Sequence, residues 1–299
     1  MSGFLRHSLA AAAMVVPLLA QDPGPGVHRF KLGKAEVTTL QDGAFQLPAT
    51  LLKGIDAAQA KALLGGKDTH AVPVNAFLVR MPGHLVLVDT GAGTAAGDAA
   101  GHLAERLKAA GVDPGQIDLV LITHCHMDHV GGLLKADGTR AFPNATLRMA
   151  QAESDFWTGD AARVPERNRA ALPALKAIVA AYAGAGKFKA FAPGEALGEG
   201  IQALPTAGHT PGHACYAFTS GGNQVWCVGD LIHFGPVQFP HPDVAVGFDW
   251  DTAKAVAARK ELFLKAAQAH ATIAGAHLAF PGLFLLEAKD GGFTATPVL

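Results

Sequence analysis

Short apolar runs typical of strands alternate along the chain with longer, alanine-rich segments typical of helices. The candidate strands lie at residues 27–40, 75–80, 84–88, 117–122, 201–204, 214–219, 224–228 and 272–274. The candidate helices lie at residues 57–64, 99–110, 150–157, 165–182 and 252–268. Strands and helices alternate in two similar halves, and in each half a histidine or an aspartate follows the end of a predicted strand. This order predicts one α/β domain of layered sheets and helices over residues 27–299.

Glycine and proline clusters mark where these elements end. Gln41-Asp42-Gly43 predicts a turn after the first strand. Met81-Pro82-Gly83 predicts a hairpin between the strands at 75–80 and 84–88. The sequence contains neither a low-complexity tract nor a linker that would divide the domain.

The N-terminal segment follows a different pattern. Arg6 and His7 precede an apolar stretch at residues 9–19, and Ala20 is followed by polar residues. A basic start, a short apolar stretch and a small residue are typical of a secretory signal peptide, and the stretch is too short to span a membrane. We therefore expect residues 1–20 to be a signal peptide and the protein to be periplasmic or secreted. The alternative is a helical or disordered N-terminal extension.

The composition favours a folded domain with a large core. Hydrophobic residues make up 49% of the 299 residues and charged residues 16%, which argues against disorder. The net charge is −1, without a long basic or acidic run, so nucleic acid and anionic membrane surfaces are not expected partners. We expect a small-molecule substrate that is mostly uncharged.

Residues 123–129 read Thr-His-Cys-His-Met-Asp-His and form the densest set of metal-ligating side chains in the chain. His124, His126, Asp128 and His129 directly follow the apolar run 117–122, where a buried strand would end. Neutral imidazole is the commonest metal ligand, and carboxylate suits a borderline ion such as zinc. Four ligands so close together can exceed what one tetrahedral ion accepts, which points to two metals. We expect a catalytic metal site here rather than a polar turn rich in histidine.

Three more potential ligands also lie at predicted strand ends. His209 follows the strand at 201–204, within a turn-rich loop. Asp230 follows 224–228 and a glycine, and His277 follows 272–274. A single histidine after a strand is usually structural, but four strand-end sites in one chain favour a shared metal centre.

The three cysteines are few for an exported chain. Cys215 and Cys227 flank a predicted turn, so a hairpin could bring them opposite each other in a disulfide. Buried free thiols in apolar strands are the favoured interpretation. Cys125 is out of phase with the ligands around it, and we expect it to face away from the metal.

Taken together, these motifs resemble the metallo-β-lactamase superfamily. They are His-x-His-x-Asp-His at 124–129, Gly-His-Thr-Pro-Gly-His at 208–213, Gly-Asp at 229–230 and Gly-x-His at 275–277. The resemblance covers nearly the whole chain after residue 26 and implies a four-layer αβ/βα sandwich with the metals at one edge between the two sheets. Asp89, in Val-Asp-Thr-Gly, matches a further marker of the superfamily, and the resemblance implies that it supports the ligand loop without binding metal.

The resemblance assigns the candidate ligands to two divalent ions, for which zinc is the expected identity, although manganese, iron and cobalt also fit such ligands. His124, His126 and His209 would hold the first ion, Asp128, His129 and His277 the second, and Asp230 would bridge them. Such ions share a hydroxide that attacks a carbonyl or phosphoryl centre. Asp128 and Asp230 are therefore the expected catalytic carboxylates, with Asp128 also steering protons. His213 is expected to be structural, and His233, His241 and His270 are not placed by the motifs.

Residues 229–240 and 275–282 resemble the group that contains methyl parathion hydrolase and related lactonases. Met127 and Ala279 depart from that group, in which proline is common at both positions. His233 stands where acyl-homoserine lactonases of another branch have a tyrosine that assists the substrate carbonyl. Relatives in this group often dimerise, so a homodimer is a further expectation.

Aromatic residues and charge guide the expected substrate. Five aromatic residues are candidates for an apolar pocket, with plain core as the alternative: Phe156, Trp157, Phe234, Phe239 and Phe280. We find no basic residue near the ligand motifs, and Arg167 is expected on the outer face of the helix at 165–182. These features favour a neutral ester, lactone or phosphotriester over an anionic phosphodiester. The alternatives are β-lactam hydrolysis, which the aspartate at 230 disfavours, and a mononuclear iron sulfur dioxygenase, which would lack a full second site.

Overall fold

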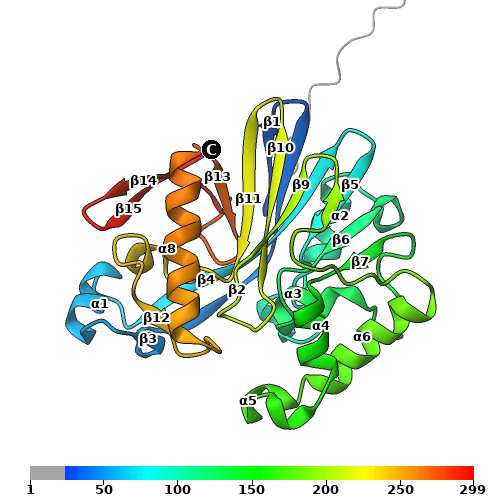
Figure 1. Cartoon of the computed structure of the whole chain (residues 1–299), viewed down its shortest axis with the longest axis horizontal. Coiled ribbons are helices and arrows are strands. Elements are labelled where there is room, and N and C mark those ends of the chain that lie inside the picture. The colour runs from blue at the N-terminus through cyan, green and yellow to red at the C-terminus, as the bar shows by residue number, and fades with distance from the viewer. Residues whose placement is uncertain (1–23) are drawn as a thin grey trace, which may run out of the picture.

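The computed structural model describes residues 24–299, in which two sheets pack face to face with helices on both outer sides (Figure 1). The predicted signal peptide at residues 1–20 lies outside the described residues. The first sheet has the order β1 (Val27–Leu32), β2 (Ala35–Pro48), β4 (Thr69–Met81), β5 (His84–Val88), β6 (Leu119–Leu121) and β7 (Thr146–Arg148). Its strands β5, β6 and β7 are parallel, and the others pair antiparallel.

The second sheet is antiparallel except where β11 pairs with β13. Its order is β15 (Gly292–Pro297), β14 (Leu283–Lys289), β13 (Thr272–Gly275), β11 (Asn223–Gly229), β10 (Ala214–Ser220), β9 (Ile201–Pro205) and β8 (Ala196–Gly198). A small ribbon of β3 (Leu52–Lys53) and β12 (Ala245–Val246) packs beside α1 (Ala57–Leu63).

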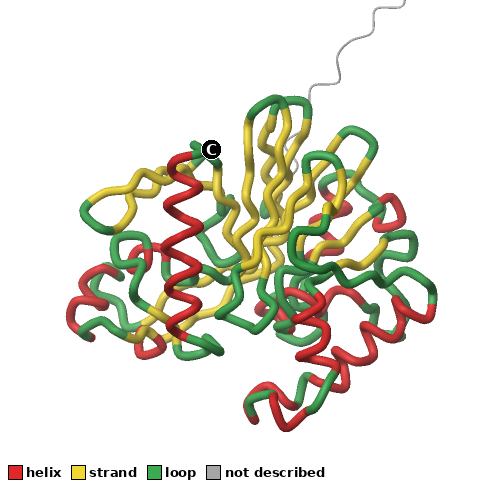
Figure 2. Tube along the Cα trace, viewed as in Figure 1, coloured by secondary structure: helices red, strands yellow, loops and turns green. Residues whose placement is uncertain are grey.

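The core lies in three layers, as the sandwich requires. Buried residues of both sheets, such as Val79 and Phe218, share the central layer. On the outside of the first sheet, a second layer packs against α2 (Leu103–Ala109), α4 (Gln151–Thr158) and α6 (Leu172–Gly184). A third layer packs the second sheet against α8 (Thr252–Gln268). The predicted αβ/βα sandwich is confirmed, and Figure 2 shows the strands of both sheets between the outer helices.

Short helices complete the described chain. They are α3 (Met127–Val130), α5 (Glu166–Arg169) and α7 (Gly235–Gln238). Short 3-10 turns lie at Ala49–Leu51, Gly97–Ala99, Pro114–Gln116, Gly131–Leu133 and Ala161–Arg163. Within residues 24–299, none of the helices combines the length and the apolar character that a membrane span requires.

The predicted turn at Gln41-Asp42-Gly43 is wrong, because β2 continues through it with a bulge. The buried Asp42 carboxylate accepts hydrogen bonds from the backbone N–H groups of Ala92, Gly101 and Leu103. The residue types of a turn therefore occur here in an irregular strand, which anchors the connection between β5 and α2. The single strand predicted at 27–40 is instead a hairpin, β1–β2, that turns at Gly33 with a φ of +58°.

The helix predicted at 165–182 is two helices, α5 and α6. Pro173 stands in the first turn of α6, where its missing N–H costs no hydrogen bond, so a new helix starts there. The helix predicted at 99–110 begins only at Leu103, because Gly101 has a φ of +109°. The hairpin of β14 and β15 was not predicted, although Asp290-Gly291 at its tip is a recognised turn pair.

Candidate metal centre

The candidate ligands come from loops that leave strands of both sheets at one edge of the sandwich. The loop after β6 carries His124 and His126, and α3 adds Asp128 and His129. The second sheet contributes His209 after β9, Asp230 after β11 and His277 after β13. The loops are fastened together, since the Ala214 N–H donates to the Thr123 carbonyl at 3.0 Å and the Tyr216 hydroxyl to the Ile122 carbonyl at 2.6 Å.

The first group of ligands combines three imidazoles with one oxygen of Asp230. One ligand atom from each of His124, His126, His209 and Asp230 lies within 4.8 Å of the others. His126 Nδ1 is 2.9 Å from His124 Nε2 and 3.0 Å from His209 Nε2. Asp230 Oδ2 is 3.4 Å from His124 Nε2 and 3.2 Å from His209 Nε2.

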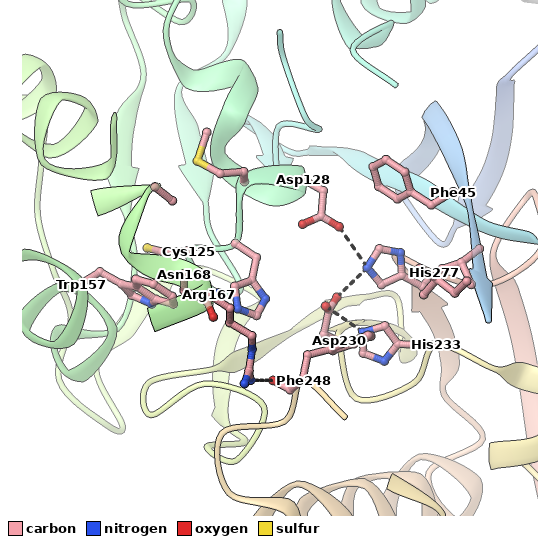
Figure 3. Close-up of a pocket in the computed structure, with 15 residues that line it drawn as sticks. Phe45, Cys125, Asp128, Trp157, Arg167, Asn168, Asp230, His233, Phe248 and His277 are labelled. Atoms are coloured by element: carbon pink, nitrogen blue, oxygen red, sulfur yellow. Dashed lines mark hydrogen bonds and ion pairs between the residues drawn. The ribbon is translucent and has the colours of Figure 1, made fainter. Parts of the chain in front are cut away.

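The second group faces the other oxygen of the same carboxylate (Figure 3). Asp128, His129 and His277 bring one ligand atom each within 4.8 Å of one another. Asp230 Oδ1 is 3.0 Å from His129 Nε2 and 3.1 Å from His277 Nε2. Asp128 Oδ2 is 3.6 Å from His129 Nε2 and 3.4 Å from His277 Nε2. All seven predicted ligand positions therefore meet in two groups that share Asp230.

These residues fit a pair of metal ions. In residues 24–299, the buried atoms His129 Nε2 and Asp230 Oδ1 form no hydrogen bond despite lying 3.0 Å apart. Buried polar atoms normally have hydrogen-bond partners. Two such atoms whose lone pairs point at one place without a hydrogen bond between them are expected where a cation binds. A tetrahedral ion with bonds of about 2.0–2.1 Å would separate its ligand atoms by about 3.3 Å. The observed separations cluster around that value.

The remaining ring nitrogens have partners that fix which nitrogen carries the proton. His129 Nδ1 donates to Asp89 at 2.8 Å and His209 Nδ1 to Asp249 at 2.9 Å. His277 Nδ1 donates to the Pro73 carbonyl at 2.7 Å. Each of these bonds leaves Nε2 with its lone pair directed into the group, as metal ligands require.

Asp89 has the supporting role that the resemblance implied. Its carboxylate also accepts from the Thr123 N–H and hydroxyl, both at 2.8 Å. Asp249 performs the same task for His209 but was not predicted, because no motif distinguishes it from other aspartates. His213 is structural, as expected, since its Nδ1 donates to Thr206 and its Nε2 accepts the Asp230 N–H.

The protonation of the site follows from burial and from Asp230. Burial and, after it, the neighbouring His209 lower the pKa of His126 to about 3, so its lone pair is available at neutral pH. Burial also acts to lower the pKa of His209, but Asp230 and Asp249 outweigh it and raise that pKa to about 9. Burial opposes ionisation of Asp230, yet His129 and His277 hold its pKa well below the usual value.

His233 belongs to the site although the motifs did not place it. Its Nε2 donates to Asp230 Oδ2 at 3.0 Å, and its ring stacks on that of His277. Its Nδ1 is buried without a hydrogen-bond partner among the described residues. The remaining histidines that the motifs left unplaced, His241 and His270, are not in any of the ligand groups of the described chain.

Glu153 in α4 joins both ligand loops from behind. It is fully buried, and one oxygen accepts from the Cys125 N–H at 2.8 Å and the Trp157 indole at 2.6 Å. The other oxygen accepts from the Thr210 hydroxyl at 2.7 Å and the Gly212 N–H at 2.9 Å. The Cys125 thiol lies against Met149 in the core behind the first sheet, as predicted.

A cavity of about 410 Å³ opens over the ligands. Its walls are largely apolar and include Phe45, Leu47, Val72, Met127, Trp157 and Phe248. Of the predicted pocket aromatics, only Trp157 lines this cavity. Phe156 lies in a small neighbouring pocket, Phe234 and Phe239 are buried in core clusters, and Phe280 is 37% exposed.

The expectation that no basic residue lies near the ligands is wrong. Arg167 and Asn168 both line the cavity. They belong to α5, a short helix separate from α6, and reach the rim of the cavity from it. Phe45 in β2 and Phe248 after β12 were also missed, because only the tertiary fold brings them to the site.

All three cysteines are free and buried. Cys215 and Cys227 lie on adjacent strands but belong to different core layers, on opposite faces of the second sheet. A disulfide between them is excluded by that geometry, and the predicted free thiols are confirmed.

Comparisons with known proteins agree with this geometry. The model of the metallo-beta-lactamase superfamily matches residues 70–277. The structure of AbOPH, a hydrolase of the beta lactamase superfamily, superposes with a TM-score of 0.86 at 34% identity, covering 92% of this chain and 98% of that one. The dizinc quorum-quenching lactonase AidC, solved with the product N-hexanoyl-L-homoserine, gives a TM-score of 0.83 at 30% identity with the same coverage.

A further relative is the uncharacterised YobT of Bacillus subtilis (strain 168). It is 27% identical over 203 residues, which cover 65% of this chain and 79% of YobT. The family model spans most of the described domain and includes every candidate ligand. The chain belongs to the metallo-beta-lactamase superfamily, and it is a metal-dependent hydrolase of that fold, close to lactonases.

Proposed function

We propose that the protein hydrolyses carboxylic ester or lactone bonds with the help of two divalent metal ions, for which zinc is the expected identity. The observation that carries this proposal is the position of Asp230, whose two oxygens face two separate groups of ligands. A site for one ion would not need a second complete group. The two unpartnered buried atoms, His129 Nε2 and Asp230 Oδ1, add support on the side of the second ion.

Two bound ions would supply an activated water and would polarise the oxygen of the reacting group. The chain's own residues then divide the remaining work. Asp230 is 3% exposed and is held by His233, so it is suited to fix the two ligand groups relative to each other. Asp128 is 24% exposed and lines the cavity, so its carboxylate is placed to accept or release a proton near the substrate.

The apolar walls of the cavity support an uncharged reacting bond attached to an apolar group. Phe45, Leu47 and Val72 on one side and Trp157 and Phe248 on the other exclude water from the ligands. AidC is a lactonase whose product carries a hexanoyl chain. A cavity of about 410 Å³ accommodates a chain of that size. Phosphotriester hydrolysis is a second candidate, because an uncharged phosphoryl group would meet the same walls.

Two other activities are less well supported. A sulfur dioxygenase binds a single iron, so it would not use the second ligand group of Asp128, His129 and His277. Hydrolysis of β-lactams is disfavoured by Asp230, since true metallo-β-lactamases lack a carboxylate at the position that would bridge the two ions. Neither alternative explains why each oxygen of Asp230 faces a separate group of ligands.

The test combines metal analysis with a substrate panel. The purified protein should bind about two equivalents of metal per chain by mass spectrometry, as the two ligand groups require. It should hydrolyse aryl esters or lactones, lose this activity on chelation, and regain it with zinc. The panel also contains acyl-homoserine lactones, a phosphotriester and a β-lactam. Binding of one iron, with oxygen uptake on a persulfide, would overturn the proposal.

We also propose that the protein is exported, on the strength of the N-terminal pattern alone. Expression of the full chain in a Gram-negative host, followed by fractionation and N-terminal sequencing, tests this. A mature N-terminus near Gln21 in the periplasmic fraction is expected. An intact Met1 in the cytoplasm would contradict it.

A further inference from the structure

Arg167 is an exposed cation at the mouth of a cavity whose walls beyond the ligands are largely apolar. It lines both the main cavity and the small pocket beside Trp157. Figure 3 draws Arg167 beside Phe248, to which it makes its one marked contact. That contact is a hydrogen bond from Nη2 to the Phe248 carbonyl, at a long 3.4 Å.

The segment that carries Arg167 is held in place by contacts on both sides of it. Val164 is buried in the core under the first sheet, and Arg169 donates to its carbonyl at 2.9 Å. The Asp160 side chain caps the preceding turn through the Ala162 N–H. These anchors fix the backbone on both sides of Arg167 and direct its side chain across the mouth of the cavity.

The donors of Arg167 are largely unused. Within residues 24–299, no carboxylate lies within 4.0 Å of its guanidinium, whereas Arg148 pairs with Glu195. The neighbouring Asn168 lines the same cavity, and its side-chain amide forms no hydrogen bond in the described chain. A guanidinium offers five N–H donors in a planar fork that matches a carboxylate, so one long bond to a carbonyl leaves most of them free.

We propose that Arg167, assisted by Asn168, is a specificity-determining residue that binds a carboxylate on the substrate. The substrate would then be an ester or lactone whose reacting bond is uncharged and whose other end carries the carboxylate. This inference rests on the proposed function and changes the expectation of a wholly neutral substrate. The carboxylates of Asp128 and Asp230 belong to the ligand groups, so a carboxylate that pairs with Arg167 would come from the substrate.

The test uses pairs of esters that differ only in the terminal charge. Monomethyl succinate, glutarate and adipate are compared with neutral methyl esters of the same chain length, on zinc-loaded protein at 0.15 M salt. The wild type should favour at least one half-ester by about 10-fold or more in kcat/KM. In Arg167→Gln the ratio of half-ester to neutral ester should fall by about 10- to 100-fold, mainly through KM. Arg167→Lys should recover part of it.

Arg163→Gln is the matched control. Arg163 is an exposed cation in the same segment that does not line either cavity, so it reports any long-range effect of charge on an anionic substrate. It should leave the ratio unchanged. An equal ratio in wild type and Arg167→Gln, an equal loss on both kinds of ester, or the same loss in Arg163→Gln would each overturn the inference.

A binding measurement separates this inference from the proposed function. Adipic acid monoamide and hexanamide, which replace the ester with an amide, are titrated calorimetrically into wild type and Arg167→Gln. Tighter binding of the monoamide that depends on Arg167 supports the subsite even if no ester is hydrolysed. Ester hydrolysis without any dependence on Arg167 would instead leave the proposed function standing and reject the subsite.

Discussion

Asp230 is the residue on which both ligand groups depend, since each of its oxygens faces one of them. Asp230→Asn keeps the size of the side chain but removes the charge that two cations would share. We expect metal content to fall below one equivalent and hydrolysis to fall by at least about 100-fold. His126→Ala should also lose metal, because it removes a ligand of the first group. Mass spectrometry and circular dichroism would check metal content and folding.

His241→Ala is the control for these variants. His241 is only partly buried and contacts Gln59 at 3.5 Å, away from the ligand groups. It should keep full metal content and activity. If purified His126→Ala kept full activity, the mechanism with two ions would be wrong.

The cysteines give a second prediction at this scale. Burial raises the pKa of Cys215 to about 12 and raises the pKa values of Cys125 and Cys227 well above their ordinary value. Since the thiolate is the reactive form, none should react at pH 8 in the native protein. Ellman's reagent should detect three thiols only after denaturation. A fast-reacting native thiol, or fewer than three in denaturant without reductant, would contradict this.

Residues could be predicted where a local pattern carries them. The ligands at 124–129, 209, 230 and 277 share a position at strand ends, and this pattern is visible in the sequence. Arg167, His233 and Asp249 have no such pattern, because only the tertiary fold brings each of them to the site. The charge of the cavity was therefore mispredicted, although the seven candidate ligands lie together at one edge of the sandwich.

At the scale of elements, α4 holds the ligand loops of the two sheets together through Glu153. In Glu153→Gln an amide N–H₂ replaces one of the two carboxylate oxygens. It would face two donors that lose their acceptor, either those of Cys125 and Trp157 or those of Thr210 and Gly212. We expect metal affinity to fall by about 10- to 100-fold, as for other residues that orient ligands. Stability should fall by about 1–3 kcal/mol. Competition with a zinc-binding dye and urea unfolding would measure the two effects.

Glu199→Gln is the matched control, since Glu199 is exposed in the turn before β9. It should change neither quantity. If Glu153→Gln lowered stability but left metal affinity unchanged, α4 would support the fold without positioning the ligands.

The elements show why sequence patterns succeed for long segments and fail at irregularities. The helix at 252–268 and the strands at 214–219 and 224–228 were predicted almost to the residue, because their apolar patterns are regular. The bulge at Gln41-Asp42-Gly43 uses turn residues for a different purpose, since Asp42 binds backbone N–H groups of a distant loop. Only the tertiary structure distinguishes that use from a turn.

At the scale of the whole molecule, the ligands connect the two sheets. His124, His126, Asp128 and His129 follow the first sheet, whereas His209, Asp230 and His277 follow the second. Ions bound between them would act as crosslinks between the halves of the sandwich. The alternation of elements predicted layered sheets and helices, whereas the two-sheet sandwich with metals at one edge was implied by the resemblance to the metallo-β-lactamase superfamily.

Removal of metal should therefore lower the stability of the entire domain, not only its activity. A ligand that binds only the folded state at 100 times its Kd adds about 2.7 kcal/mol, and 1 kcal/mol corresponds to about 2–4 °C in a domain of this size. Chelation should lower the melting temperature by at least about 5 °C, and zinc should restore it, as measured by circular dichroism. Asp230→Asn, which lacks the shared carboxylate and should bind less than one equivalent of metal, should show a smaller decrease in melting temperature on chelation than the wild type. An unchanged melting temperature of the wild type after complete metal removal would show that direct contacts alone, such as Tyr216 with Ile122, hold the halves together.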